Sequence, residues 1–274
     1  MFFSWREGND DVYVTDLGGG HERRLTTHPA MDGAPTASPD RHTIAFASAR
    51  DGLMQLFLMD ADGNNQRPLL QSSFYDYWPS WAPDGSRVLF QRRDASGQFD
   101  LWSVAADGTD ERRLTSLPRN EIGGSYSADG STVVFAGNNG TGRDVWVVPA
   151  TGGAPKVLTA DACIVGTAPC VLASDVQPSW TPAGDIVFVS DRSGSNAIWF
   201  MSADGSNPQL VRDFGTASVA MPSVSENGQW ITFVTDAHDP GGERNVYVMR
   251  ADGTHLRQLV DRGDDLAPRF AGRS

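Results

Sequence analysis

An aromatic residue flanked by strand-forming residues recurs six times along this chain of 274 residues. Successive rings lie 44 to 53 residues apart, and they are Tyr13, Phe57, Trp102, Trp146, Trp199 and Tyr247. A period of this length indicates repeated units that each contain several strands and that cannot bury both faces alone. We therefore expect an array of stacked repeats.

The other parts of the repeat are equally regular. Each ring is preceded by an apolar strand that ends in phenylalanine, at Phe2, Phe46, Phe90, Phe135, Phe188 and Phe233. Before that strand comes another, opened in most copies by proline, and a turn such as Pro83-Asp84-Gly85 joins the two. After the ring strand comes a glycine turn, such as Asp62-Gly63, and a short last strand. Because Pro, Asp and Gly each favour turn conformations, the repeat is predicted to be four antiparallel strands joined by tight hairpins.

Six such units predict an all-β fold, a six-bladed β-propeller with four antiparallel strands per blade. The segment from Asp265 matches only the first strand of a repeat, whereas Phe2 lies in the second. The N-terminal strands should therefore pair with a C-terminal strand, which closes the ring and removes its open edges. We expect one domain over residues 1–274, with blades at about 1–26 plus 265–274, 32–70, 76–115, 121–159, 175–211 and 219–260. A start inside a blade also suggests a piece of a longer, exported protein.

Two blocks of the repeat carry a resemblance to a known family. They are Trp78-Pro79-Ser80-Trp81-Ala82-Pro83-Asp84-Gly85 followed by Val88-Leu89-Phe90, and Asn245-Val246-Tyr247-Val248-Met249-Arg250-Ala251-Asp252-Gly253. They resemble the WD-like repeat of TolB-type propellers, and the resemblance extends over the whole chain. It implies a periplasmic propeller that binds partner proteins at its channel mouth, although similar propellers gate peptidases or carry polysaccharide lyase sites. The sequence does not include the N-terminal α/β domain of TolB, so the role in the Tol system does not carry over.

Composition narrows the partners. The chain has 22 basic and 34 acidic residues, which give a formal net charge of −12. Such a charge repels phosphate backbones, so nucleic acid is not expected as a partner. No apolar run approaches the about 18 to 20 residues that cross a bilayer, and the start lacks the pattern of a signal peptide. We expect a monomer that neither inserts into a membrane nor carries its own export signal.

Two cysteines, Cys163 and Cys170, lie seven residues apart around a loop that contains glycine and proline. A disulfide between them would indicate an oxidising compartment, which favours a periplasmic or secreted location. The alternative is a pair of free thiols in a cytosolic protein. A zinc site has less support, because neither cysteine has a second close Cys or His.

An acidic residue stands three residues before the proline or glycine of the first strand in five repeats, at Asp32, Asp76, Glu121, Asp175 and Asp265. One interpretation is an acidic ring at one mouth of the channel, which would hold Ca²⁺ or a basic group of a partner. The other is structural, with each carboxylate tying a neighbouring connection through backbone N–H groups. Arginines that follow the Phe strand, such as Arg50, are expected to brace a hairpin against carbonyl groups or a neighbouring Asp.

Catalytic motifs are absent from the sequence. It contains no Gly-x-Ser-x-Gly, no His-Glu-x-x-His and no glycine-rich phosphate loop. The irregular loop before Pro79 carries four aromatic residues, Phe74, Tyr75, Tyr77 and Trp78, which suit a peptide side chain or a sugar. We therefore predict a non-catalytic platform that binds a protein or peptide partner at the channel mouth, with a carbohydrate as a further candidate ligand. The alternative is a lyase or hydrolase acting on a carbohydrate or lactone, with a channel cation as Lewis acid.

Overall fold

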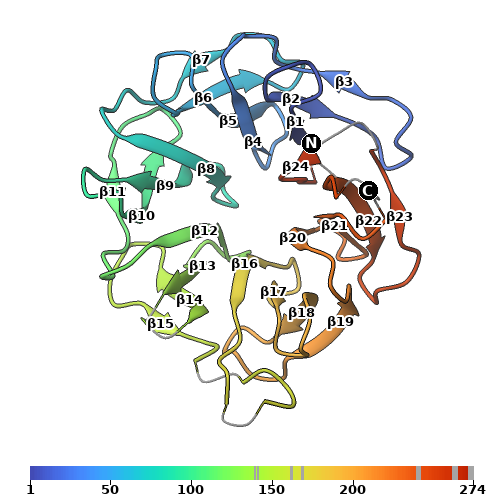
Figure 1. Cartoon of the computed structure of the whole chain (residues 1–274). Helices are drawn as coiled ribbons and strands as arrows, with labels where there is room; N and C mark the ends of the chain where they lie inside the picture. Colours follow the sequence, from blue (N-terminus) through green and yellow to red (C-terminus); the bar gives the residue numbers. More distant parts are fainter. Residues whose placement is uncertain are drawn as a thin grey trace.

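The computed structural model describes residues 1–138, 140, 142–160, 163–167, 170–238, 242–260 and 265–270. Six antiparallel sheets of four strands stand around a central opening (Figure 1), and the described residues contain strands and turns but no helix. This arrangement is the predicted six-bladed β-propeller. In the same residues, no helical segment of the length and hydropathy of a membrane span occurs.

Each sheet runs from an inner strand at the opening to a short outer strand. The first sheet combines β24 (Asp265–Leu266), β1 (Phe2–Ser4), β2 (Asp11–Val14) and β3 (Arg23–Arg24). The next two contain β4 (Asp32–Ala37), β5 (Thr43–Ser48), β6 (Gln55–Asp60) and β7 (Arg67–Pro68), and then β8 (Tyr75–Trp81), β9 (Arg87–Arg93), β10 (Phe99–Ala105) and β11 (Arg112–Arg113).

The other three sheets follow the same order. They contain β12 (Glu121–Tyr126), β13 (Thr132–Asn138), β14 (Arg143–Pro149) and β15 (Lys156–Val157); β16 (Asp175–Trp180), β17 (Ile186–Ser190), β18 (Ala197–Met201) and β19 (Gln209–Asp213); and β20 (Val219–Val224), β21 (Trp230–Thr235), β22 (Asn245–Arg250) and β23 (Arg257–Gln258).

The ring closes as the sequence predicts. Strand β24 pairs with β1 in antiparallel register, with Phe3 opposite Leu266 and Ser4 opposite Asp265. Beyond this pair, the Met1 nitrogen donates to the Arg269 carbonyl oxygen at 2.7 Å, and the Arg269 nitrogen donates to the Met1 oxygen at 2.8 Å. The C-terminal segment is thereby the inner strand of a blade whose other three strands come from the N-terminus.

A bulge interrupts the inner strand of every blade. In the second blade Gly33 pairs with Ala47 and Thr36 pairs with Ala45, so the inner strand has one residue more than its partner. The residue before the proline or glycine takes a positive φ of 49° to 67° at Ala34, Trp78, Gly123, Gln177, Met221 and Ala267. Left-handed backbone costs about 1–2 kcal/mol for a residue other than glycine, and a bulge re-aims side chains. These positions therefore decide what faces the opening.

Phenylalanines and rings fill the blades. The six phenylalanines of the second strands, from Phe2 to Phe233, are all essentially inaccessible to solvent. In several blades the phenylalanine lies against the ring of the next strand, with Phe46 and Phe57 centroids 5.8 Å apart. Burying such a side chain contributes about 1.5–3 kcal/mol. One apolar cluster contains Leu56 and Phe90 from neighbouring blades, so burial also joins blade to blade.

The glycines of the Asp-Gly turns tie each blade to the one before it. Gly63 has φ +92°, and a Cβ placed there would lie 2.7 Å from the carbonyl oxygen of Leu25 in the preceding blade. At Gly108 the corresponding distance to the Leu69 oxygen is 2.1 Å. Only glycine meets both demands, a left-handed backbone and a close approach of another chain segment. The repeat therefore requires glycine here to stack the blades.

Candidate functional site

The five acidic residues of the first strands are fully buried inside their blades. In four blades the carboxylate forms an ion pair with an arginine of its own blade, through Arg6–Asp265, Arg50–Asp32, Arg92–Asp76 and Arg192–Asp175. Among the described residues, no three His, Cys, Asp or Glu side chains come together as a metal site. The five acids thus do not gather into a ligand ring, and the structure gives the Ca²⁺ interpretation no support in this part of the chain.

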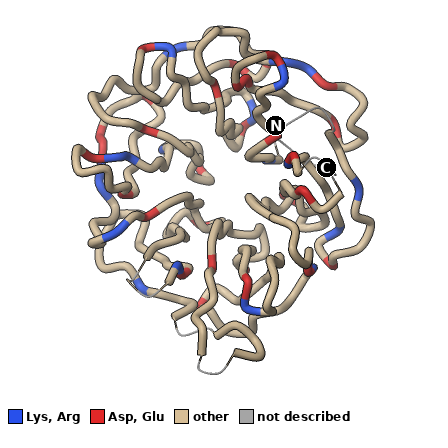
Figure 2. Tube along the Cα trace, viewed as in Figure 1, with Lys and Arg blue, Asp and Glu red and all other residues tan. Residues whose placement is uncertain are grey.

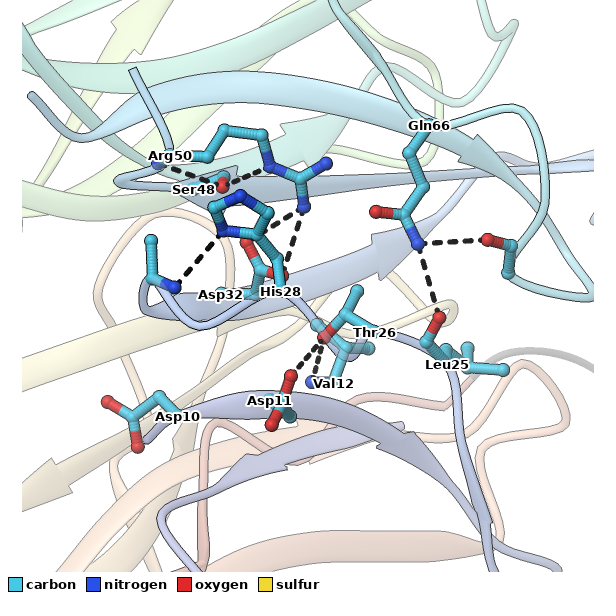
Figure 3. A network of polar contacts seen from close by, with 12 residues as sticks. Asp10, Asp11, Val12, Leu25, Thr26, His28, Asp32, Ser48, Arg50 and Gln66 are labelled. Atoms are coloured by element: carbon cyan, nitrogen blue, oxygen red, sulfur yellow. Dashed lines mark hydrogen bonds and ion pairs between the residues drawn. The ribbon is translucent and has the colours of Figure 1, made fainter. Parts of the chain in front are cut away.

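Three of these blades use the same arrangement of side chains. In Figure 3, Arg50 donates from Nε to the Ser48 hydroxyl at 2.8 Å and from its terminal nitrogen to both Asp32 oxygens at 3.0 and 3.1 Å. The guanidinium carbon lies 4.7 Å from the centroid of the Phe57 ring. Arg6 and Arg192 are placed in the same way. The arginine therefore neutralises the acid and covers the aromatic pair, which is a structural role.

Glu121 is the exception, because no arginine accompanies it in the described ion pairs. It accepts hydrogen bonds from the Thr115 hydroxyl at 2.7 Å and from the Leu117 nitrogen at 2.5 Å. Burial, reinforced by the nearby Asp100 carboxylate, raises the pKa of Glu121 to about 8 despite these two bonds. At neutral pH this carboxyl group is therefore largely protonated.

Tyr75, Tyr77 and Trp78, predicted from the sequence to belong to an irregular loop, lie instead in strand β8, and neighbouring rings among them are in contact. Tyr75 and Tyr77 have ring centroids 5.9 Å apart, Tyr77 and Trp78 5.1 Å apart, and Tyr75 lies 6.2 Å from Phe99. We call Tyr75, Tyr77, Trp78 and Phe99 the aromatic mouth. All four are only partly buried. Phe74, predicted to belong with them, is 39% exposed and lies beside Arg92, 5.3 Å from its guanidinium carbon to the ring centroid.

The aromatic mouth breaks the repeat. At the position of Tyr77 the other blades have Gly33, Ile122, Val176, Ala220 and Leu266. At the position of Trp78 they have Ala34, Gly123, Gln177, Met221 and Ala267. Burial raises the pKa of the Tyr77 phenol, so its hydroxyl stays protonated and can donate a hydrogen bond. Residues that the fold does not need in every blade are candidates for binding.

A cavity of about 140 Å³ lies between the inner strands of four blades and the C-terminal segment. Trp78, Gln91, Gln177, Met221 and Arg269 are among its lining residues. Apart from Trp78, none of these residues is predicted from the sequence to belong to a site. A signal was present, because Arg269 occupies the position that holds Thr or Ser in every other blade, at Thr36, Ser80, Ser125, Ser179 and Ser223.

Cys163 and Cys170 form a disulfide in the structure, with their Cα atoms 5.5 Å apart. Cys163 also pairs with Leu172 in an isolated antiparallel bridge, and the Val165 nitrogen donates to the Arg192 carbonyl oxygen at 2.8 Å. The disulfide loop is thus held against Leu172, which follows it in the sequence, and against the hairpin between β17 and β18.

The model of the TolB beta propeller domain matches residues 1–163, which is more than half of the 274 residues. The chain belongs to the TolB beta-propeller domain family. Among the similar proteins, an uncharacterized protein of Agrobacterium fabrum is 35% identical to this chain over 85 residues. That match covers 31% of this chain and 29% of the relative, so the chain spans under a third of the length of that relative.

Two solved structures show the same propeller fold. A putative TolB from Agrobacterium tumefaciens superposes with a TM-score of 0.79 at 20% identity, over 100% of this chain and 94% of that one. An oligogalacturonate lyase from Vibrio parahaemolyticus superposes with a TM-score of 0.64 at 14% identity, over 95% and 74%. Because a putative TolB and an oligogalacturonate lyase share the fold, function has to be argued from side chains.

Proposed function

We propose that this TolB-like propeller is a non-catalytic platform that binds a protein or peptide partner at the aromatic mouth. The observation that supports it most is the clustering of Tyr75, Tyr77 and Trp78 with Phe99 at positions where the other blades carry no aromatic residue. Trp78 takes φ 55° there, a conformation that a bulky residue rarely adopts. Such strain is retained where the orientation of the side chain matters.

Aromatic residues suit this task physically. Their rings bring a large apolar area with few rotatable bonds, and Tyr and Trp also offer a polar edge. Binding energy at protein interfaces concentrates in such residues, each contributing about 2 kcal/mol or more. The side chains of the mouth already contact one another, so little conformational entropy is lost when a partner docks.

The extracytoplasmic location is part of the proposal. Its support is the Cys163–Cys170 disulfide, since such bonds persist in oxidising compartments and are rare in the cytosol. A lyase or hydrolase with a channel cation has less support, because the described residues bring together no metal-binding group of three side chains.

Capture from the envelope fraction of the source organism tests the platform. Immobilised protein is compared with a Tyr75→Ala, Phe99→Ala variant and with a Trp5→Ala control, in which a 53% exposed ring outside the mouth is removed. We expect the control to retain the captured partner and the double variant to lose affinity by more than about tenfold. A partner retained equally by all three proteins would show that the mouth is not the binding surface.

A further inference from the structure

The cavity at the centre of the ring has an unusual polar lining. The polar side chains around its volume of about 140 Å³ are Trp78, Gln91, Gln177 and Arg269, and the remaining lining residues are apolar or glycine. At about 30 Å³ per water in the liquid, the space holds roughly four or five waters. It is large enough for one small polar group and too small for a folded segment.

Arg269 supplies a positive charge that has no ion-pair partner among the described residues. Its backbone is held by the exchange of hydrogen bonds with Met1, and its side chain lines the cavity. Within the described part of the chain, no carboxylate forms an ion pair with it. Burial lowers the pKa of the Arg269 guanidinium, yet an arginine remains charged at neutral pH. A chain of net charge −12 thus places at the axial cavity a cation that no carboxylate of the described residues neutralises. Figure 2 shows most other Lys and Arg positions toward the outside of the ring.

The two glutamines are oriented by the backbone. Gln91 Oε1 accepts from the Gly123 nitrogen at 3.1 Å, and Gln177 Oε1 accepts from the Met221 nitrogen at 2.9 Å. A backbone N–H can only donate, so each carboxamide must turn its oxygen to the backbone. The NH₂ groups are the polar atoms that remain, and no acceptor for them occurs among the described residues. The side-chain groups left for a ligand are therefore all donors.

We propose that this cavity binds a carboxylate group, with Arg269 as its charged partner and the amide groups of Gln91 and Gln177 as further donors. A carboxylate matches the planar fork of a guanidinium and accepts several hydrogen bonds at once. The proposal goes beyond binding at the aromatic mouth, because it concerns the axial cavity, which shares only Trp78 with the mouth, and a ligand of different chemistry. Since Arg269 belongs to the closing segment and the glutamines belong to other blades, the ligand would also hold the ring closed.

Sodium acetate is the probe, with sodium chloride at equal ionic strength as the reference. We expect acetate to raise the melting temperature of the wild-type protein and to give a saturable heat by titration calorimetry. Arg269→Ser gives the first blade the residue type that the other blades carry at this position, and it should weaken acetate binding by at least about tenfold. Arg67→Ser, which removes an exposed arginine of the outer strand β7, should leave binding unchanged. Acetate effects that are absent in the wild type, or equal in all three proteins, would overturn the proposal.

Gln177→Glu is the second variant, and it tests the proposal even if Arg269→Ser does not fold. The new carboxylate can still accept from the Met221 nitrogen and brings an anion into the cavity, so the acetate response should disappear. A response that persists in this variant contradicts the proposal, and so does phosphate binding as tightly as acetate, which would indicate a general anion site.

Two sources of the carboxylate are separated by short peptides. Competition with acetate by a peptide with a free C-terminus, but not by its amide, assigns the group to a chain end. Competition by neither peptide assigns it to a small organic acid. None of these measurements uses a captured partner, so they stand or fall independently of the aromatic mouth.

Discussion

Asp265, in strand β24, and Arg269, just beyond it, lie four residues apart, yet their charges have opposite surroundings. Asp265 is fully buried and forms an ion pair with Arg6 at 2.7 Å. Arg269 faces the axial cavity without such a pair in the described residues. The first charge belongs to a pattern that recurs from blade to blade, and the second occurs once. Four of the recurring acids are paired with an arginine inside their own blade, whereas Arg269, which occurs once, has no such pair among the described residues.

The bulge explains how one strand does both. An uninterrupted strand alternates its side chains between two faces with a period of two. The extra residue at Ala267, with φ 49°, changes that alternation between the acid and Arg269. The Asp265 side chain therefore lies inside the blade, and the Arg269 side chain lines the cavity.

Removing residues 265–274 breaks both sides of this comparison at once and should have the largest effect. The deletion leaves Arg6 without its buried partner and exposes the edge of β1. We expect the unfolding free energy to fall by at least the about 3–5 kcal/mol of one broken buried pair, which corresponds to about 6–20 °C in melting temperature. Deleting only residues 271–274 is the control and should change little. Equal melting curves for the full chain and the longer deletion would contradict the closure.

Arg92→Met tests the satisfied side alone. Asp76 receives two hydrogen bonds from Arg92, at 2.7 and 2.8 Å, and would be left as a buried unpaired carboxylate. We expect a loss of about 3–5 kcal/mol in urea denaturation. Arg41→Met removes an exposed pair with Glu226 and should cost at most about 1 kcal/mol. A loss at Arg92 no larger than that at Arg41 would show that the buried pairs are not important for stability.

Glu121→Gln sharpens the comparison through pH and should have the smallest effect at neutral pH. The folded state holds the pKa of Glu121 at about 8, above its ordinary value of 4.5, so the folded state binds the proton more tightly. This contribution to stability is complete below about pH 4.5 and is lost as the pH rises through 8. The variant should remove that decline in melting temperature between pH 5 and pH 8. Glu226→Gln, at an exposed site, should leave it in place. An unaltered slope in Glu121→Gln would contradict the assigned protonation.

Much of the candidate site followed from comparing repeats in the sequence. The aromatic residues Tyr75, Tyr77 and Trp78 are predicted because they depart from the repeat, and the structure places their rings in contact, although in strand β8 and not in a loop. The acidic positions were also recognised, but their orientation was not, because sequence spacing does not tell whether a carboxylate faces a channel or an arginine. Arg269 is not predicted from the sequence, because it lies in a partial repeat whose only recognisable element is the strand that closes the ring.

The sequence by itself determined the number of blades, the strands in each, and the closure by the two ends. These follow from local chemistry repeated in register, such as the Pro-Asp-Gly turns, the Asp-Gly turns and the buried phenylalanines. Only the tertiary structure decided which polar side chains are paired within the protein and which remain available to a ligand. That outcome depends on bulges at positive φ and on hydrogen bonds across blades. One example is the bond that the Met221 nitrogen donates to Gln177 Oε1, 44 residues away in the sequence. Contacts between residues far apart in the sequence leave no local pattern. The donor-lined cavity can therefore be identified only from the folded ring, in which residues of several blades come together.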